Sequence, residues 1–232
     1  ASLAPTNSDW HYALLEMGEK WREVSNGQVD LQIIGGGQGG DEQDILRRMR
    51  IGQFHAGTIS TAGLQYITPS VVVLGIPMLM EDQAALHRVR EAVGPKLEEV
   101  FLDKGYVLIH WADLGWMRFF TPSPDPSPEA VTSYTYVQWA EDSLSRLWRQ
   151  AGFPPGVRMT LPEVTVGLET GMVEAVNTSP LVVAAYQWFR NLPYVIDVRW
   201  APLCGATLVD RWVWERIPSE IRPALLRIAR EP

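Results

Sequence analysis

Apolar residues at helical spacing mark the predicted helices. Between Trp10 and Val24 an apolar residue recurs every third or fourth position, and such spacing places one apolar face toward a core. Residues suited to capping this helix come just before it: Asn7, Ser8 and Asp9. The same spacing and the same kind of end signals predict further helices at Asp41–Ile51, Asp82–Lys104, Asp142–Ala151, Pro162–Thr170, Pro180–Phe189 and Ser219–Arg230.

Alternating or short apolar runs mark the predicted strands. Gln28–Ile34 alternates polar and apolar residues with a period of two, as a half-buried strand does. Ala1–Pro5 reads as the end of a buried strand. Shorter runs predict strands at Phe54–Ile59, Tyr106–Trp111, Tyr134–Trp139, Met172–Val176, Val195–Val198 and Gly205–Val209. Because strands alternate with helices along the chain, we expect an α/β architecture with largely parallel sheets.

A proline-rich stretch divides the pattern. Residues 121–128 alternate prolines with polar residues, and such a stiff segment is typical of a crossing between domains. We therefore expect two lobes. Lobe I takes most of residues 1–112 and lobe II most of 113–204, with crossing strands near 113–135 and 195–209. Residues 205–232 return as a final strand and a C-terminal helix.

Composition and charge exclude several classes of protein. The chain of 232 residues is 46% hydrophobic and has a formal net charge of −7, without a basic cluster, so we expect no nucleic-acid partner. Its one cysteine, Cys204, excludes a disulfide scaffold and is expected to be a small buried residue. The longest nearly uncharged run, residues 56–80, contains glycines and prolines that a membrane-spanning helix would not. We expect that a secretory signal was removed or never included.

Motifs for catalysis or metal binding are weak. Gly35–Gly40 leads into a helix, as phosphate-binding loops do, but it lacks a P-loop lysine and is followed by acidic residues. A strand-to-helix turn is the better interpretation. The histidines show no metal-ligand spacing, so neither a metal nor a cofactor is expected. Asp142 and Glu174 are a candidate carboxylate pair for general acid–base chemistry, although each lies at a helix start or strand end where it would be capped and solvated.

The ten tryptophans are more than a core of this size needs. Trp21, Trp148 and Trp188 fall at helical spacing and are expected in the core. Trp212 and Trp214 lie two residues apart, so we expect one of them to be exposed.

Three other tryptophans lie at the ends of predicted elements, where α/β sheets open ligand crevices: Trp10, Trp116 and Trp139. Cleft lining and core packing both stay open for them. Asn177, Thr178 and Ser179 end a strand just before a helix, so their side chains either face the same crevice or cap that helix.

An ordered set of short motifs resembles a known family. The motifs are Trp10-His11, Gly35-Gly36 to Gly40-Asp41-Glu42, Met49 to Gln53, Ser127-Pro128-Glu129, Leu168 to Glu174, and Gln187-Trp188-Phe189. In this order they resemble the DctP-type solute-binding proteins of tripartite ATP-independent periplasmic (TRAP) transporters. The resemblance implies a two-lobe, periplasmic-binding-protein-like fold with a ligand cleft between the lobes. It further implies delivery of the ligand to a membrane permease, and that family segments before Ala1 and after Arg230 are absent from this chain.

One position departs from the family. Most members hold an organic carboxylate with an arginine in the strand after Ser-Pro-Glu, whereas this sequence has Val137 there. The chain therefore resembles an atypical branch without that arginine, and Arg118 is the nearest remaining cation. Burying an unpaired anion is costly, so we expect an aromatic, apolar or weakly charged ligand. Some relatives of that branch pair with a helical-repeat protein, which gives a possible further partner.

The sequence thus predicts a periplasmic or otherwise extracytoplasmic solute-binding protein that is not an enzyme. The residues expected to contact the ligand are Trp10, Thr61, Trp116, Arg118, Trp139, Asn177 and Thr178. Two alternatives stay open. One is an enzyme on the same scaffold with Asp142 or Glu174 as base and Arg118 as electrophile, and the other is a ligand-free interaction or sensor protein.

Overall fold

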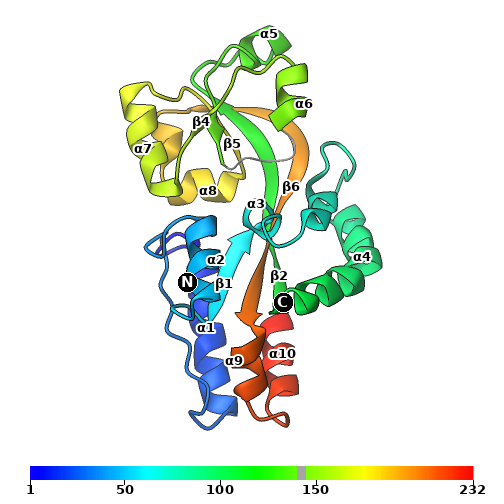
Figure 1. Ribbon diagram of the computed structural model, residues 1–232. Helices are drawn as coiled ribbons and strands as arrows, with labels where there is room; N and C mark the ends of the chain where they lie inside the picture. Colours follow the sequence, from blue (N-terminus) through cyan, green and yellow to red (C-terminus); the bar gives the residue numbers. More distant parts are fainter. Residues whose placement is uncertain (140–144, 232) are drawn as a thin grey trace. The chain divides into compact units, whose positions relative to one another are not determined.

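The computed structural model describes residues 1–139 and 145–231, which form two compact units (Figure 1). The first unit comprises Ala1–Leu74, Ala84–Asp113 and Cys204–Pro232, and the second comprises Gly75–Gln83 and Leu114–Leu203. The chain changes unit inside strand β2 (Tyr106–Thr121) and inside strand β6 (Tyr194–Asp210). Residues 121–128, where the prolines suggested a crossing, lie within the second unit.

Local capping explains where the first helices begin. Helix α1 (Asp9–Val24) starts after Ser8, whose side chain accepts a hydrogen bond from the backbone N–H of His11. Helix α2 (Glu42–Arg50) starts at a reciprocal capping box between Asp41 and Asp44. The other helices of the first unit are α3 (Thr61–Leu64), the 3₁₀ helix η1 (Pro69–Gly75), α4 (Gln83–Asp103), α9 (Arg211–Arg216) and α10 (Arg222–Arg230).

The main sheet has the strand order β1-β6-β2-β5, with β1 at Ala56–Ser60 and β5 at Val176–Thr178. Strand β1 is antiparallel to β6, and β5 is antiparallel to β2. The expectation of largely parallel sheets is therefore wrong for these pairs. The order of elements along the chain shows where strands lie but not which strands become neighbours, and β6 inserts beside β1 from far along the sequence.

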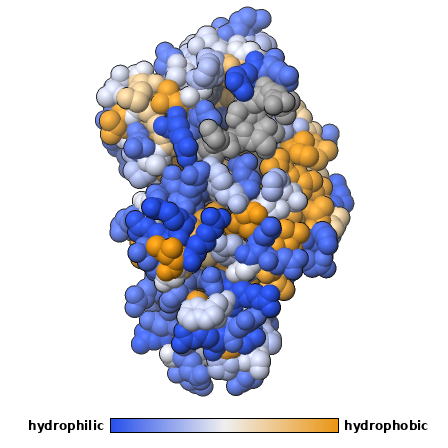
Figure 2. Space-filling model, in the orientation of Figure 1, coloured by the Kyte–Doolittle hydropathy of each residue, from blue (hydrophilic) through white to orange (hydrophobic). Residues whose placement is uncertain are grey.

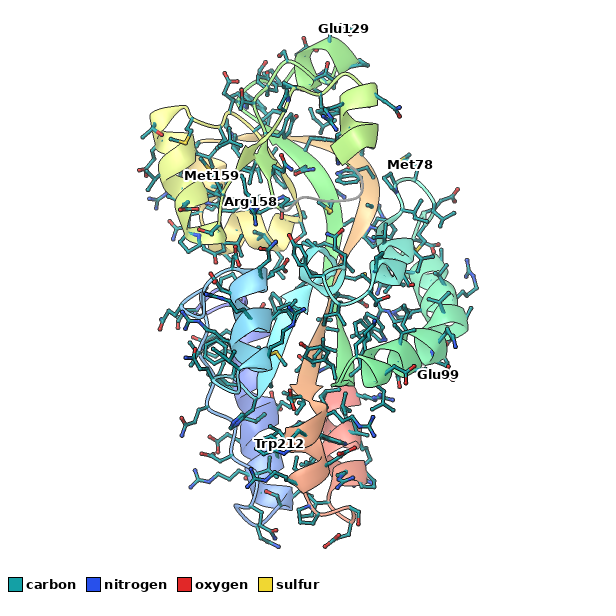
Figure 3. The ribbon with its side chains drawn as sticks, viewed as in Figure 1. Met78, Glu99, Glu129, Arg158, Met159 and Trp212 are labelled. Atoms are coloured by element: carbon teal, nitrogen blue, oxygen red, sulfur yellow. The ribbon has the colours of Figure 1, made fainter. Side chains whose placement is uncertain are left out.

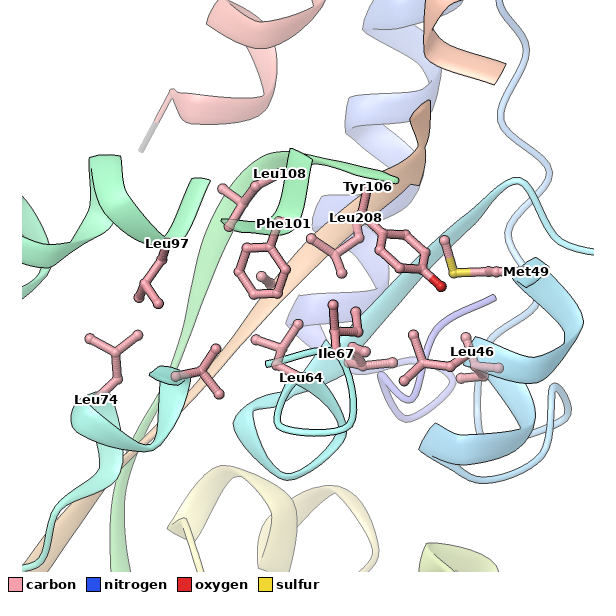
Figure 4. Packing of buried hydrophobic residues seen from close by; sticks show 14 residues of the cluster. Leu46, Met49, Leu64, Ile67, Leu74, Leu97, Phe101, Tyr106, Leu108 and Leu208 are labelled. Carbon is pink, nitrogen blue, oxygen red and sulfur yellow. The ribbon is translucent and has the colours of Figure 1, made fainter. Parts of the chain in front are cut away.

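Two apolar clusters form the core of the first unit. One packs α2, η1 and α4 onto the strands around Phe101, Leu64 and Leu208, all of which are almost fully buried (Figure 4). The other joins α1 to α10 through Trp21, which is 2% exposed and whose Nε1 donates a 3.0 Å hydrogen bond to the Leu225 carbonyl oxygen. Trp21 thus belongs to the core, as predicted.

The second unit is built from short elements around aromatic residues. The elements that it adds to β2, β5 and β6 are α5 (Pro128–Val131), β3 (Val137–Gln138), α6 (Ser145–Gln150), β4 (Val157–Arg158), α7 (Leu161–Thr170), α8 (Pro180–Ala185) and the 3₁₀ helix η2 (Trp188–Arg190). Strands β3 and β4 are parallel. Phe119 stacks on Trp200, and Trp148 meets Trp200 edge to face at 4.9 Å. Trp188 is 1% exposed in a second cluster, so both Trp148 and Trp188 pack as predicted.

The structure corrects several predicted elements. Gln28–Ile34 is not a strand, although its exposure alternates as predicted, with Val29, Leu31 and Ile33 packed against the α1 cluster. Among the described residues, Ser2 donates to the Ile34 carbonyl and Gln28 N–H donates to the Ser25 carbonyl, so the segment forms no ladder. The helix predicted over Pro180–Phe189 breaks at Gln187, whose φ is +58°.

The two strands predicted at Val195–Val198 and Gly205–Val209 are one continuous strand, β6. Gly205 allows close strand pairing, because a Cβ there would lie 2.6 Å from the Ile59 carbonyl oxygen. Helix α9 was not predicted.

The glycine-rich segment turns the chain into helix α2, but the strand predicted before it, Gln28–Ile34, does not form, so the interpretation as a strand-to-helix turn is only half right. Gly36 and Gly40 have φ of +63° and +93°, and a Cβ at Gly36 would lie 2.4 Å from Thr6 Oγ1. The positive φ and the lack of room for a side chain therefore explain why glycines occupy these positions.

Polar residues dominate the face drawn in Figure 2, with apolar patches between them. Trp212 is 61% exposed (Figure 3) while Trp214 is 6% exposed, which confirms the expected asymmetry. Cys204 is fully buried, as expected. Within residues 1–139 and 145–231, no helix is both long and apolar enough to span a membrane.

Candidate functional site

Strands β2 and β5 bring together three residues that the sequence analysis selected. Their register pairs Arg118 with Thr178 and Phe119 with Asn177. Directly opposed residues of an antiparallel pair point to one face of the sheet, so Arg118 and Thr178 share a face. Thr178 is 4% exposed. Asn177, its neighbour in β5, pairs with Phe119, so its side chain points to the opposite face, where it is 9% exposed. The sheet therefore sets a cation beside a buried hydroxyl at one place in the second unit.

Arg118 has one N–H group in an ion pair and another that is buried without a partner among the described residues. Its Nη1 donates to Asp197 Oδ1 of strand β6 at 2.8 Å. The Arg118 side chain is 23% exposed, whereas that of Asp197 is 80% exposed. Arg118 Nε is buried and has no hydrogen-bond partner within the described residues. A guanidinium can bind a carboxylate through two parallel N–H groups, and Asp197 does not contact the edge that contains Nε.

Trp139 lies beside Asn177. Its indole Nε1 donates to the Asn177 carbonyl oxygen at 2.9 Å and lies 3.2 Å from Asn177 Oδ1. Its ring stacks on Trp188, with centroids 6.2 Å apart, and this contact anchors the indole to a buried neighbour. Trp139 is therefore partly buried and fixed, and it orients the amide of Asn177.

Two further residues lie next to this group. Trp116 is partly buried and precedes Arg118 by two positions, which puts both on the same face of β2. Ser179 ends β5 and precedes α8, and its Oγ is buried without a hydrogen-bond partner among the described residues. We define the second-unit site as Trp116, Arg118, Trp139, Asn177, Thr178 and Ser179, with Asp197 as the ion-pair partner.

Sequence reasoning missed Asp197 and left Ser179 out of the final set. Asp197 lies in a predicted strand, but only the strand order puts that strand beside β2. For Ser179 a signal was present, because it ends the predicted polar triplet before a proline.

Trp10 and Thr61 belong to the first unit, so their part in ligand binding stays a prediction. Trp10 is partly buried in the first turn of α1, and its Nε1 is buried without a hydrogen-bond partner in the described chain. Thr61 begins α3 and is partly buried.

Glu42 supports the start of α3 from the neighbouring helix α2. Its Oε1 accepts a 2.7 Å hydrogen bond from the backbone N–H of Ser60, the residue that caps α3. Burial raises the pKa of Glu42 from 4.5 to about 7, despite the hydrogen bond, which lowers it. The turn that carries Thr61 thus rests on a carboxyl group that titrates near neutral pH.

The residues of the enzyme alternative do not form a described pair. Asp142 lies outside the described residues. The Glu174 carboxylate accepts a 3.0 Å hydrogen bond from the Thr135 backbone N–H, a bond that fixes the chain before β3. In the part of the chain that the structure describes, no cluster of three metal-ligating side chains occurs.

A fixed indole, a buried amide, hydroxyl groups and an arginine with an unpaired Nε are groups that can bind a small organic anion. The family model for bacterial extracellular solute-binding proteins, family 7 (DctP), matches residues 1–232. The chain belongs to this family. Its relatives are solute-binding proteins rather than enzymes, which agrees with the expectation from the sequence.

Individual relatives are distant in sequence and close in fold. A solute-binding protein of Roseobacter denitrificans is 21% identical over 230 residues, which are 98% of this chain and 70% of that protein. A TRAP periplasmic solute-binding protein from Desulfovibrio salexigens, with bound orotic acid, gives a TM-score of 0.90 at 17% identity over 98% of this chain and 74% of its own. DctP7 of Bordetella pertussis, an extracytoplasmic receptor binding pyroglutamic acid, gives 0.91 at 17% identity over 98% and 75%. The predicted two-lobe, periplasmic-binding-protein-like fold is confirmed.

Proposed function

We propose that this protein is an extracytoplasmic TRAP receptor that binds a small, flat organic ligand with one carboxylate and delivers it to a membrane permease. The observation that carries the proposal is the buried, unpaired Nε of Arg118 on the same sheet face as the buried Thr178. An unsatisfied buried N–H of a charged group costs free energy that a bound carboxylate recovers.

The charge of the site supports a weakly anionic ligand. At the position where the resemblance places the family arginine, Val137 is 4% exposed and packs in an apolar cluster. Arg118 is partly neutralised by Asp197. A site with one such cation favours one carboxylate over two. The relatives from Desulfovibrio salexigens and Bordetella pertussis bind orotic acid and pyroglutamic acid, which fits an acid as ligand.

The aromatic side chains support a flat ligand. Trp139 is held by Asn177 and Trp188, so its ring offers a fixed surface for stacking. Trp116 shares the face of Arg118, and we include Trp10 and Thr61 of the first unit as further contacts. A helical-repeat partner, which the resemblance also implied, stays a prediction.

Fluorescence titration tests this function, because the proposed site contains tryptophans. The library consists of flat monocarboxylates, with matching amides as uncharged controls. We expect a saturable change with a carboxylate, and about tenfold or greater weakening in Arg118→Gln. Arg190→Gln, which removes an exposed arginine of the same unit, is the control and should bind like the wild type. No saturable signal across the library, or unchanged binding in Arg118→Gln, would overturn the proposal.

A further inference from the structure

We infer that Asp197 sets the charge of the ligand, by restricting the site to molecules with a single carboxylate. The inference rests on the proposed function and concerns a residue that the sequence analysis did not select.

The sheet places Arg118 between two different partners. In the strand order, β2 lies between β6 and β5. On the β5 side, Arg118 faces Thr178, a buried hydroxyl. On the β6 side, its Nη1 meets the carboxylate of Asp197 at 2.8 Å. Asp197 contacts Nη1, whereas Nε is buried and unpaired, so Asp197 can keep its contact while a ligand carboxylate binds the Nε edge.

A ligand bound at that edge lies next to a resident negative charge. One ligand carboxylate is balanced by Arg118, which it shares with Asp197. A second carboxylate on the same small molecule is repelled by Asp197 across a few ångströms. Because Asp197 is 80% exposed, water stabilises its charge, and the residue stays in place without a buried partner.

Simple structural support does not account for this ion pair. Pairs with one strongly exposed member contribute little to folding stability. Strand β6 is already hydrogen-bonded to β2 in the main sheet, so it does not need this side-chain bond to stay beside β2. The ion pair instead reduces the charge of the one cation in the second-unit site.

The test compares two flat probes that differ by one carboxylate, benzoate and isophthalate, by isothermal titration calorimetry on the full chain. We expect the wild type to prefer benzoate, and Asp197→Asn to reduce this preference about five- to tenfold, mainly through tighter isophthalate binding. Asp197→Glu restores a carboxylate and should keep the preference. Glu129→Gln neutralises an exposed acid on α5 (Figure 3) and should leave the preference unchanged.

Each other outcome overturns the inference. The inference is wrong if the wild type binds benzoate and isophthalate with equal affinity, or if Asp197→Asn keeps the wild-type preference for benzoate. Binding of neither probe to either protein also overturns it, whereas the proposed function is decided separately by the monocarboxylate library and Arg118→Gln. Thermal unfolding of each variant shows that the compared proteins are folded.

Discussion

Because of Glu42, the free energy of unfolding should decrease as the pH rises from mildly acidic to neutral. It is the first residue of α2, is partly buried, and accepts a hydrogen bond from Ser60 N–H. Its folded-state pKa is raised from 4.5 to about 7, chiefly because burial disfavours the charged form. The perturbation that isolates it is Glu42→Gln, which keeps an acceptor for Ser60 and removes the titration.

The sign and size follow from proton linkage. Between pH 4.5 and about 7 the folded state holds a proton that the unfolded state has released, so stability decreases as pH rises. Each pH unit corresponds to about 1.4 kcal/mol, which sets a ceiling of about 3 kcal/mol over this interval. Because the side chain is only partly buried, solvent screening reduces the expected value to about 1–2 kcal/mol. Glu42→Gln should match the wild type at pH 4.5 and exceed its stability by that amount at pH 8.

Urea unfolding at a series of pH values measures this difference. The wild type alone does not isolate it, because burial and Arg230 lower the pKa of His110 to about 4, which destabilises the fold as pH falls below 6.5. Subtracting the wild-type free energy of unfolding from that of Glu42→Gln cancels the His110 contribution. Glu129→Gln, an exposed acid, is the control for a general charge effect. A difference between Glu42→Gln and wild type that is the same at pH 4.5 and pH 8 would refute the reasoning.

Three further predictions concern the core and the sheet. Trp21→Phe should lower the free energy of unfolding by about 1–3 kcal/mol, since it removes a buried hydrogen bond to α10, and Trp21→Ala by about 3–5 kcal/mol. Gly205→Ala should lower the free energy of unfolding by about 1–3 kcal/mol, because the new Cβ meets a β1 carbonyl oxygen. Gly94→Ala, which has open space around it in α4, should leave that free energy unchanged or raise it by up to about 1 kcal/mol. Equal effects of the two changes would contradict this account. Cys204 should resist Ellman's reagent until the protein unfolds, because it is fully buried and burial raises its pKa to about 12; rapid modification of the native protein would show otherwise.

Local signals in the sequence predicted the helices well. Capping residues and apolar spacing place α1 and α4 within a residue or two of the observed bounds. These features depend on neighbours a few positions apart, so they can be read from the chain directly. The alternation in Gln28–Ile34 shows the limit of such signals: it correctly predicted which side chains are covered, but covered side chains do not require a strand partner.

Partners far apart in sequence could not be predicted in this way. The pairing of β1 with β6 joins residues near 58 to residues near 207, and the ion pair of Arg118 joins it to Asp197. Both depend on which strands become neighbours, and no local pattern specifies that. Arg118 was selected as the nearest remaining cation, and Asn177 and Thr178 from their place at a strand end; the strand register sets Arg118 opposite Thr178. Their role toward a ligand is the part of the account that experiment must decide.

An electron-density map of the protein with a monocarboxylate from the library tests the central claim most directly. The account predicts a carboxylate on the Nε edge of Arg118, with the ligand ring against Trp139 and Asp197 still on Nη1. A ligand whose carboxylate lies away from Arg118, or a site filled by the protein's own side chains, would contradict it.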